Sequence, residues 1–277
     1  MNPGRPATGG STTTTAVLGA LAGAVLLVMV LVVAFPDWFA PYPPERTDLR
    51  AVLEGPSAAH PLGTDQLGRD VLSRLVDGAR LSVLIAAAAT AVGVLGGALI
   101  GLLSAAAGTR VDSLLMRAVD VLLAFPELLL ALLVVAVLGS GAVNTALAIG
   151  IAAIPNYARL VRGQALVVLR SDYVEAARML GVAPTRYLVR HVLPNVSGPV
   201  VVLASIGTGT ALITASGLSL FGLGPRPPQA DWGAMVADGK DFLQLAWWVS
   251  VTPGAAIVLV VVVMTLVGRG LQLRVLR

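Results

Sequence analysis

The sequence predicts an all-α, polytopic membrane protein. Hydrophobic residues make up 56% of the 277 residues and charged residues only 12%, whereas a soluble domain carries about 25% charged residues. Uncharged runs recur along the chain, and each approaches the roughly 20 apolar residues that a transmembrane helix needs. Because backbone polar groups cannot stay unpaired in lipid, each run is expected to be helical.

The first apolar run covers residues 16–35, after a stretch at 1–15 that we expect to be flexible and cytoplasmic. A cleaved signal peptide is the alternative, but its apolar core would be about 7–15 residues long and would end in small residues. This run is longer and is followed by Phe35, Trp38 and Phe39, which suit a membrane interface. We therefore expect an uncleaved membrane anchor.

Residues 36–80 are predicted to be an extracytoplasmic segment that contains an amphipathic helix. Apolar residues recur at helical spacing from Arg69 to Ser82, with charges between them. We expect this helix to lie on the outer leaflet as an interfacial helix, and Asp65 is its candidate N-cap. A docking surface for an external protein is the alternative.

Further apolar runs lie near residues 81–107, 119–138, 144–161, 196–218 and 248–268, which predicts six transmembrane helices in all. The core of five spans occupies residues 81–268, and a short tail follows at 269–277. The third and fourth spans are separated by Gly139, Ser140 and Gly141, so we expect an antiparallel hairpin. Glycines on the second span would let neighbouring helices approach closely.

The basic residues predict that both ends of the chain are cytoplasmic, since basic residues concentrate in cytoplasmic loops. In this orientation the outer segments hold an excess of acidic residues. The cytoplasmic segments hold most of the arginines: Arg5, Arg110, Arg117, Arg159, Arg162, Arg170, Arg178, Arg186, Arg190, Arg269, Arg274 and Arg277.

A polar insert at residues 163–195 interrupts the apolar pattern on the cytoplasmic side. Asp172 and Glu175 have the spacing of a capping box, and Gly181 is a candidate stop for the short helix that follows them. Pro184 suits the first turn of a second helix, which Pro194 is expected to end. A plain cytoplasmic loop is the alternative to a functional pair of helices.

Several classes of site have no support in the composition. The chain has no cysteine and only two histidines, so no metal site is predicted. It contains no phosphate-binding G-x-x-x-x-G-K-[ST] loop, and no catalytic or cofactor-binding set is expected. Its basic residues do not cluster with aromatic residues, which argues against nucleic-acid binding.

The insert resembles the EAA loop of permeases in binding-protein-dependent ABC importers. Glu175, Ala176 and Ala177 are followed by Gly181 and, after twelve intervening residues, by Pro194. Five longer stretches resemble the C-type permease of dipeptide, oligopeptide and nickel importers: HPLGTDQLGRDVLSRLVDGARLS, MRAVDVLLAFPELLLALL, RHVLPN, FGLGPRPPQADWGAM and WWVSVTPGAAI.

This resemblance implies a coupling loop that docks on a cytoplasmic ATPase. The residues it implicates are Asp172, Tyr173, Glu175, Ala176, Ala177, Leu180, Gly181, Leu193 and Pro194. The implied partners in a bacterial inner membrane are a second permease subunit, two ATP-binding subunits that bind ATP and Mg²⁺, and an external substrate-binding protein.

Two acidic residues of the third span are candidates for the translocation path. Asp120 and Glu127 are seven residues apart, so one helix would place them on one face. Charges in a span should face protein or water. Arg117 is expected to pair with Asp120, which we interpret as a structural charge, while Glu127 follows a kink at Pro126.

Peptides are the first expected substrate, and nickel or another metal chelate is the second. A stand-alone secondary transporter would need repeated halves with broken helices, and no convincing internal repeat is present. An intramembrane enzyme would need several polar catalytic residues in the spans, where only Asp120 and Glu127 stand out.

Overall fold

Helices dominate the part of the chain that the computed structural model describes, residues 9–275. Within this range the only β-structure is an isolated bridge between Thr64 and Asp70, and the predicted all-α class is confirmed. Arg5 and Arg277 lie outside the described residues, as do the start of the predicted segment 1–15 and the end of the predicted tail.

The elements follow one another in a simple order. They are α1 (Gly9–Ala34), η1 (Pro36–Trp38), α2 (Val71–Ala106), α3 (Thr109–Leu123), α4 (Glu127–Leu138), α5 (Ala142–Leu169), α6 (Asp172–Met179), α7 (Pro184–Tyr187), η2 (Leu188–Val192), α8 (Leu193–Leu220), α9 (Trp232–Gly239), η3 (Lys240–Phe242) and α10 (Trp248–Val275).

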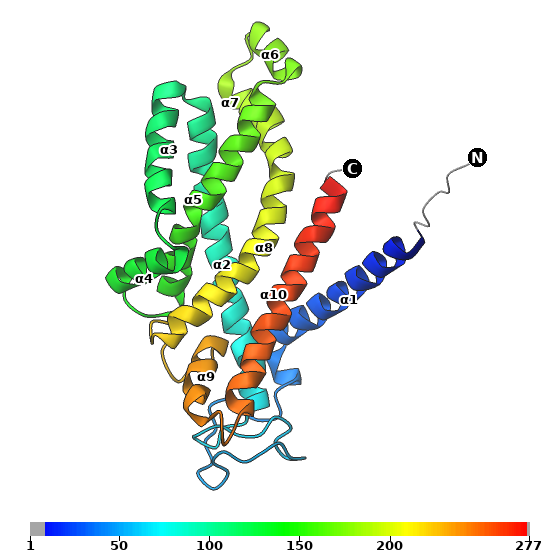
Figure 1. Ribbon diagram of the computed structural model, residues 1–277, viewed down its shortest axis with the longest axis vertical. Helices are drawn as coiled ribbons and strands as arrows, with labels where there is room; N and C mark the ends of the chain where they lie inside the picture. The colour runs from blue at the N-terminus through cyan, green and yellow to red at the C-terminus, as the bar shows by residue number, and fades with distance from the viewer. Residues whose placement is uncertain (1–8, 276–277) are drawn as a thin grey trace, which may run out of the picture.

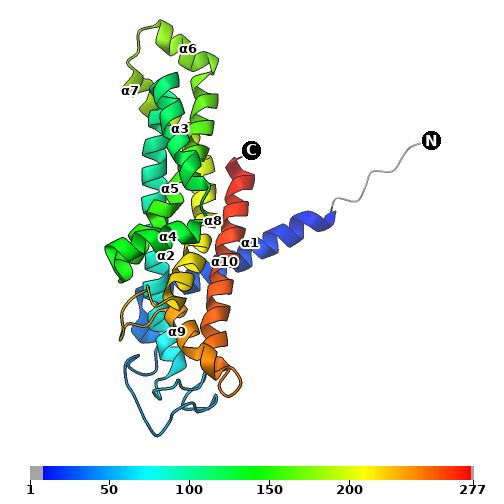
Figure 2. The ribbon, with the colours of Figure 1, turned by 60° about the vertical axis from the view of Figure 1, so that its left-hand side comes forward.

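Figure 1 shows an elongated bundle with two different ends. The short helices α6 and α7 form one end, called the α6 end below. The segment between α1 and α2 lies at the opposite end with α9, and this is called the α9 end. Helices α2, α5, α8 and α10 run along the long axis, while α1 leans away from them. The view turned by 60° shows the same separation of the ends (Figure 2).

Within the described residues, three helices are long and apolar enough to cross a membrane by length and composition: Val71–Ala106, Pro184–Leu220 and Trp248–Leu273. The bent pair α3 and α4 would make a fourth span. The predicted fourth span lies in the 28-residue helix α5, which is not in this set, and the apolar part of α1 is the shorter Gly23–Ala34. The count of six spans therefore stays a prediction.

The third predicted span, residues 119–138, is not one straight helix. Helices α3 and α4 meet at an angle of 94°, and Pro126 lies at the break with ψ of 133°. Proline lacks an N–H and disfavours the helical conformation in the residue before it. The predicted kink is confirmed, but Asp120 and Glu127 lie on different helices, so the prediction of one shared face is wrong.

The amphipathic stretch at residues 69–82 is not a separate interfacial helix. It forms the first turns of α2, which begins at Val71 and runs unbroken to Ala106. Val71 is fully buried, so this face packs against protein rather than lipid. The N-cap is Asp70, whose Oδ2 accepts from the backbone N of Ser73 at 2.7 Å, and the assignment of this role to Asp65 was wrong.

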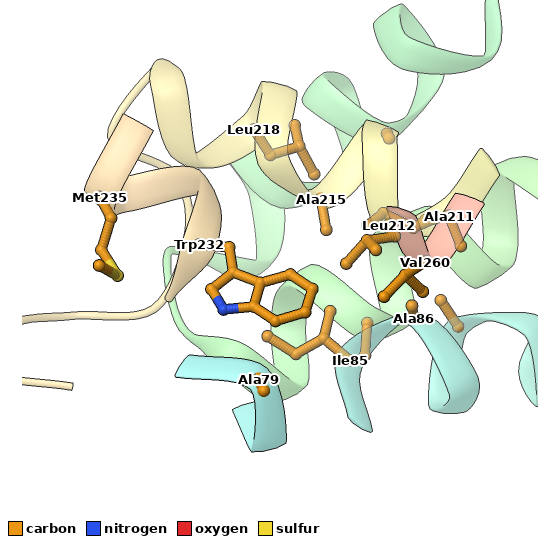
Figure 3. Close-up of a cluster of buried hydrophobic side chains, with 14 of the residues drawn as sticks. Ala79, Ile85, Ala86, Ala211, Leu212, Ala215, Leu218, Trp232, Met235 and Val260 are labelled. Carbon is orange, nitrogen blue, oxygen red and sulfur yellow. The ribbon is translucent and has the colours of Figure 1, made fainter. Parts of the chain in front are cut away.

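The main hydrophobic core lies toward the α9 end and is closed by the indole of Trp232. Figure 3 shows this ring between side chains of α2, such as Ile85, and side chains of α8, such as Leu218. Its Nε1 donates to the carbonyl of Leu75 at 2.8 Å. The preceding residue, Asp231, is buried and accepts from Ser82 Oγ at 2.8 Å and from Ser219 Oγ at 2.7 Å. Helix α9 is thereby fixed to α2 and to α8.

Small residues bring α2 and α5 into direct backbone contact. A Cβ on Gly97 would lie 2.3 Å from the Cβ of Tyr157 and 2.8 Å from the backbone N of Ala158. One turn later, a Cβ on Gly101 would lie 2.6 Å from the carbonyl oxygen of Ala158. Such close approach is typical of small residues at interfaces between membrane helices. The predicted close packing of the second span is confirmed.

We expect Gly97→Ala and Gly163→Ala to change stability in opposite directions. A Cβ at Gly97 meets backbone and must push α2 from α5, and such overpacking costs about 1–3 kcal/mol. At Gly163, on the same helix pair, no atom lies within 4 Å of the added Cβ, so the alanine should gain about 0.5–1 kcal/mol from helix propensity. Thermal unfolding of the detergent-purified protein measures both changes. An unchanged Tm for Gly97→Ala would contradict the close contact.

Candidate functional site

The first candidate site is the short helix α6 at the α6 end. Its N-cap is Ser171, and no side chain caps the helix. The hydroxyl of Ser171 instead donates to the carbonyl of Val168 at 2.5 Å. The predicted capping box was therefore wrong, since Asp172 is already the first helical residue. Asp172 and Glu175 still lie in the first turn, where the helix dipole favours negative charge.

The C-terminus of α6 has the predicted glycine stop. Gly181 has a φ of +74°, and its backbone N donates to the carbonyl of Arg178 at 3.0 Å. The backbone N of Val182 donates to the carbonyl of Ala177, also at 3.0 Å. These two bonds are the Schellman pattern, which needs a left-handed residue at this position. Gly181 therefore sets the bend between α6 and α7.

The second helix begins at Pro184 as predicted but does not end at Pro194. Helix α7 passes into the π-turn η2 and then directly into α8, which contains Pro194 in its first turn. In the π-turn the N–H of Leu193 donates to the carbonyl of Leu188, one residue further back than in an α-helix. This wider turn accommodates the missing N–H of Pro194, because π-bulges change the hydrogen-bond register within a helix. The prediction that Pro194 ends the helix was wrong.

A second hydrophobic core joins α6 to the long helices. The side chain of Val174 is fully buried and packs in one cluster with Val161 and Ala165 of α5 and Val196 of α8. The guanidinium of Arg178 lies over the ring of Tyr187, 5.2 Å from its centroid. Helix α6 is therefore anchored through this cluster to the ends of α5 and α8.

The opposite face of α6 is exposed at the extreme end of the molecule (Figure 1). Leu180 is 84% exposed and Met179 is 78% exposed, so two large apolar side chains project from the last turn. Most of the predicted coupling residues share this exposure: Asp172, Tyr173, Glu175, Ala176, Leu180 and Gly181. Ala177 is half-buried, while Leu193 and Pro194 are also exposed but belong to α8.

Some residues that matter for this end were missed from the sequence. Met179 was not singled out, although it is as prominent as Leu180. The anchors Val174 and Tyr187 were also missed. Val174 lies two residues after Asp172 in a region of mixed polarity, so helical periodicity over eight residues gives little indication of which side faces the protein.

The acidic residues of α3 are paired with arginines of α5. Asp120 forms an ion pair with Arg159, so the predicted partner Arg117 was wrong. Asp112 accepts from Arg162 through both carboxylate oxygens, at 2.5 and 2.6 Å. These pairs fix α3 alongside α5. Their formation agrees with the interpretation of Asp120 as a structural charge.

The second candidate site is a pocket of about 310 Å³ between α2, α5, α8 and the start of α4. Its lining is mostly apolar, and its polar residues are Glu127, Thr90, Asn156, Tyr157 and Thr210. Asn156 Nδ2 donates to Glu127 Oε2 at 3.4 Å. Concave, mostly apolar sites with a few polar groups are typical of ligand pockets. Of this polar set, sequence reasoning identified only Glu127.

Within the described part of the chain, no group of three or more His, Cys, Asp or Glu side chains could hold a metal ion. His60 lies at the α9 end, where its Nδ1 is 2.9 Å from Asp70 Oδ1, the carboxylate that also caps α2. His60 therefore has a role in the local structure of the segment before α2. The predicted absence of a metal site and of a cofactor stays a prediction.

Comparison with known proteins places these features in a wider group. Residues 97–277 match the family model described as "Binding-protein-dependent transport system inner membrane component". The dipeptide transport system permease protein of Escherichia coli (strain K12) is 43% identical over 261 residues, with 92% of this chain and 87% of that protein covered.

Two further similarities extend this result. The di/tripeptide transport system permease protein of Pseudomonas aeruginosa (strain UCBPP-PA14) is 41% identical over 261 residues, covering 92% of this chain and 86% of that protein. Among solved structures, an inward-facing MetNI methionine ABC transporter has a chain with a TM-score of 0.60 at 18% identity, covering 74% of this chain and 97% of that chain. The last similarity concerns the fold alone.

We expect Val174→Ala to loosen α6 without unfolding the bundle. Removal of its buried methyl groups costs about 1–3 kcal/mol in lost burial and cavity formation, and this loss acts on the contact that holds α6. Backbone amides of α6 should then exchange with deuterium faster, while those of α2 and α5 remain protected. Met179→Ala is the matched control, because that side chain is exposed. Equal exchange in both variants would show that Val174 does not anchor α6.

Proposed function

The chain belongs to the family of binding-protein-dependent transport system inner membrane components, and from this premise we propose that it forms half of the translocation path of an ATP-driven importer. The other half is a second permease subunit. Two cytoplasmic subunits bind ATP and Mg²⁺, and an extracytoplasmic protein delivers the substrate. This chain has no catalytic, metal or cofactor site of its own in this proposal.

The exposed helix α6 carries the proposal. It presents two large apolar side chains, Leu180 and Met179, at the end of the long helices. Exposed apolar residues of this size favour a protein–protein contact. The chain also contains no phosphate-binding loop of the G-x-x-x-x-G-K-[ST] type. A transporter driven by ATP would therefore need a partner subunit at this surface.

The substrate proposed here is a peptide of two or a few residues. Relatives with about two-fifths of their residues identical are named as dipeptide and di/tripeptide permeases. A metal chelate such as nickel is the alternative, as predicted.

We assign the α6 end to the cytoplasm and the α9 end to the outside of a bacterial inner membrane. The six spans and the cytoplasmic N- and C-termini belong to this assignment. The basic residues at the α6 end support it. Arg178 lies on α6, Arg186 lies on α7, and Arg170 follows the last residue of α5. Basic residues mark the cytoplasmic side of membrane proteins.

Coupling follows from how α6 is held. When the ATPase subunits move, α6 moves with them, because its exposed face contacts them. Val174 and Tyr187 then transmit the displacement to the ends of α5 and α8. These same two helices line the pocket that contains Glu127. A displacement of α6 thus changes the shape of the path between α5 and α8.

We expect Leu180→Asp to abolish stable contact with the ATPase subunits. A carboxylate in place of an apolar contact residue should weaken binding by more than 1.4 kcal/mol, which corresponds to about a tenfold lower affinity. The measurement is the amount of ATPase subunit that co-purifies with the tagged chain from detergent. Leu245→Asp is the matched control, because Leu245 is 71% exposed at the opposite end.

Equal recovery of ATPase subunits with Leu180→Asp and with wild type would refute α6 as the docking element. Loss of ATPase subunits with Leu245→Asp as well would assign the effect to folding rather than to docking. Proteolysis of sealed vesicles tests the orientation separately, since α6 should be cleaved only from the cytoplasmic side.

A further inference from the structure

From the Glu127 pocket we infer a subsite that binds the free ammonium group of the substrate. This inference rests on the proposed function and specifies the chemistry that the path selects. Glu127 and Asn156 supply the oxygen acceptors, while the apolar residues around them contact the rest of the ligand. Helix α4 leaves the bundle between the two ends of the molecule (Figure 1), and its first residue, Glu127, lines the pocket.

The charges around Glu127 leave its carboxylate without a cation. The acidic residues of the neighbouring helix are both matched, since Asp120 pairs with Arg159 and Asp112 with Arg162. Among the described residues, no basic side chain lies within 4.0 Å of Glu127 oxygens, and its polar contact is the amide of Asn156. The two arginines of α5 nearest in sequence to Asn156 are therefore already occupied.

An unmatched carboxylate in a membrane bundle is costly and should face a ligand or water. The start of α4 offsets part of this cost, because Glu127 is its first residue and the helix dipole is positive there. The dipole keeps the carboxylate available but does not replace a hydrogen-bonding cation. A substrate that brings its own positive charge would complete the site on entry.

An ammonium fits this site better than a metal ion. It has N–H donors, for which a carboxylate and an amide oxygen are suitable acceptors. A transition metal would need several convergent nitrogen, oxygen or sulfur ligands, and the described residues offer no such group. The volume of about 310 Å³ lies at the lower end of the roughly 300–1,000 Å³ of ligand pockets, which suits a small peptide.

The test compares alanylalanine with lactylalanine, in which a hydroxyl replaces the ammonium. Ligand binding is measured by saturation-transfer NMR on the purified complex of both permeases and the ATPase subunits, without the external binding protein. We expect Glu127→Gln to raise the Kd of alanylalanine by about tenfold, since a charge-assisted hydrogen bond is lost. The Kd of lactylalanine should not change. Asp241→Asn is the control for a distant acidic residue.

Three outcomes would overturn the subsite. These are equal binding of both ligands by the wild-type complex, an unchanged alanylalanine Kd in Glu127→Gln, and failure of Glu127→Gln to co-purify with the second permease. The last result would mean that a cation of the partner subunit pairs with Glu127. Displacement of alanylalanine by equimolar NiCl₂ in the wild type would instead favour a metal site. The proposed function fails separately, if ATPase subunits do not assemble with the wild-type chain.

Discussion

The close contact between α2 and α5 is the constraint on which both candidate sites depend. Gly97 and Gly101 let the backbone of α2 reach the backbone of α5 near Ala158. This contact determines where Tyr157 and Asn156 of α5 lie along α2. It therefore positions one wall of the pocket. It also fixes where the far end of α5 stands, and that end carries the residues that anchor α6.

Helix α5 thus links two regions that differ in physical character. Toward its middle, Asn156 and Tyr157 face a pocket that a ligand can fill. Toward its end, Val161 and Ala165 are buried in the hydrophobic cluster that also contains Val174 of α6. Packed helices transmit displacement because their cores resist compression. In the proposed mechanism, a movement of α6 is therefore carried along α5 rather than absorbed where α6 joins it.

Local signals in the sequence were sufficient for some elements and not for others. The stop at Gly181, the start at Pro184 and the kink at Pro126 depend on backbone conformation within a few residues, and all three were predicted. The pairing of Asp120 with Arg159 depends on a tertiary contact, because the position of α5 determines it. The start of α2 at the Asp70 cap and the passage of the helix through Pro194 by a π-turn are local features that were not predicted. Spacing along the chain does not show which helices come together.

The break at Pro126 gives two acidic residues different environments. On one straight helix Asp120 and Glu127 would share a face, and the arginines of α5 could neutralise both. The turn of 94° separates them. Asp120 stays on α3 and is held by Arg159, while Glu127 begins α4 beside the pocket. A carboxylate that the protein leaves unmatched can discriminate between ligands, because its partner must come from the ligand. The kink therefore places one acidic residue in a structural ion pair and leaves the other for the proposed recognition of the substrate.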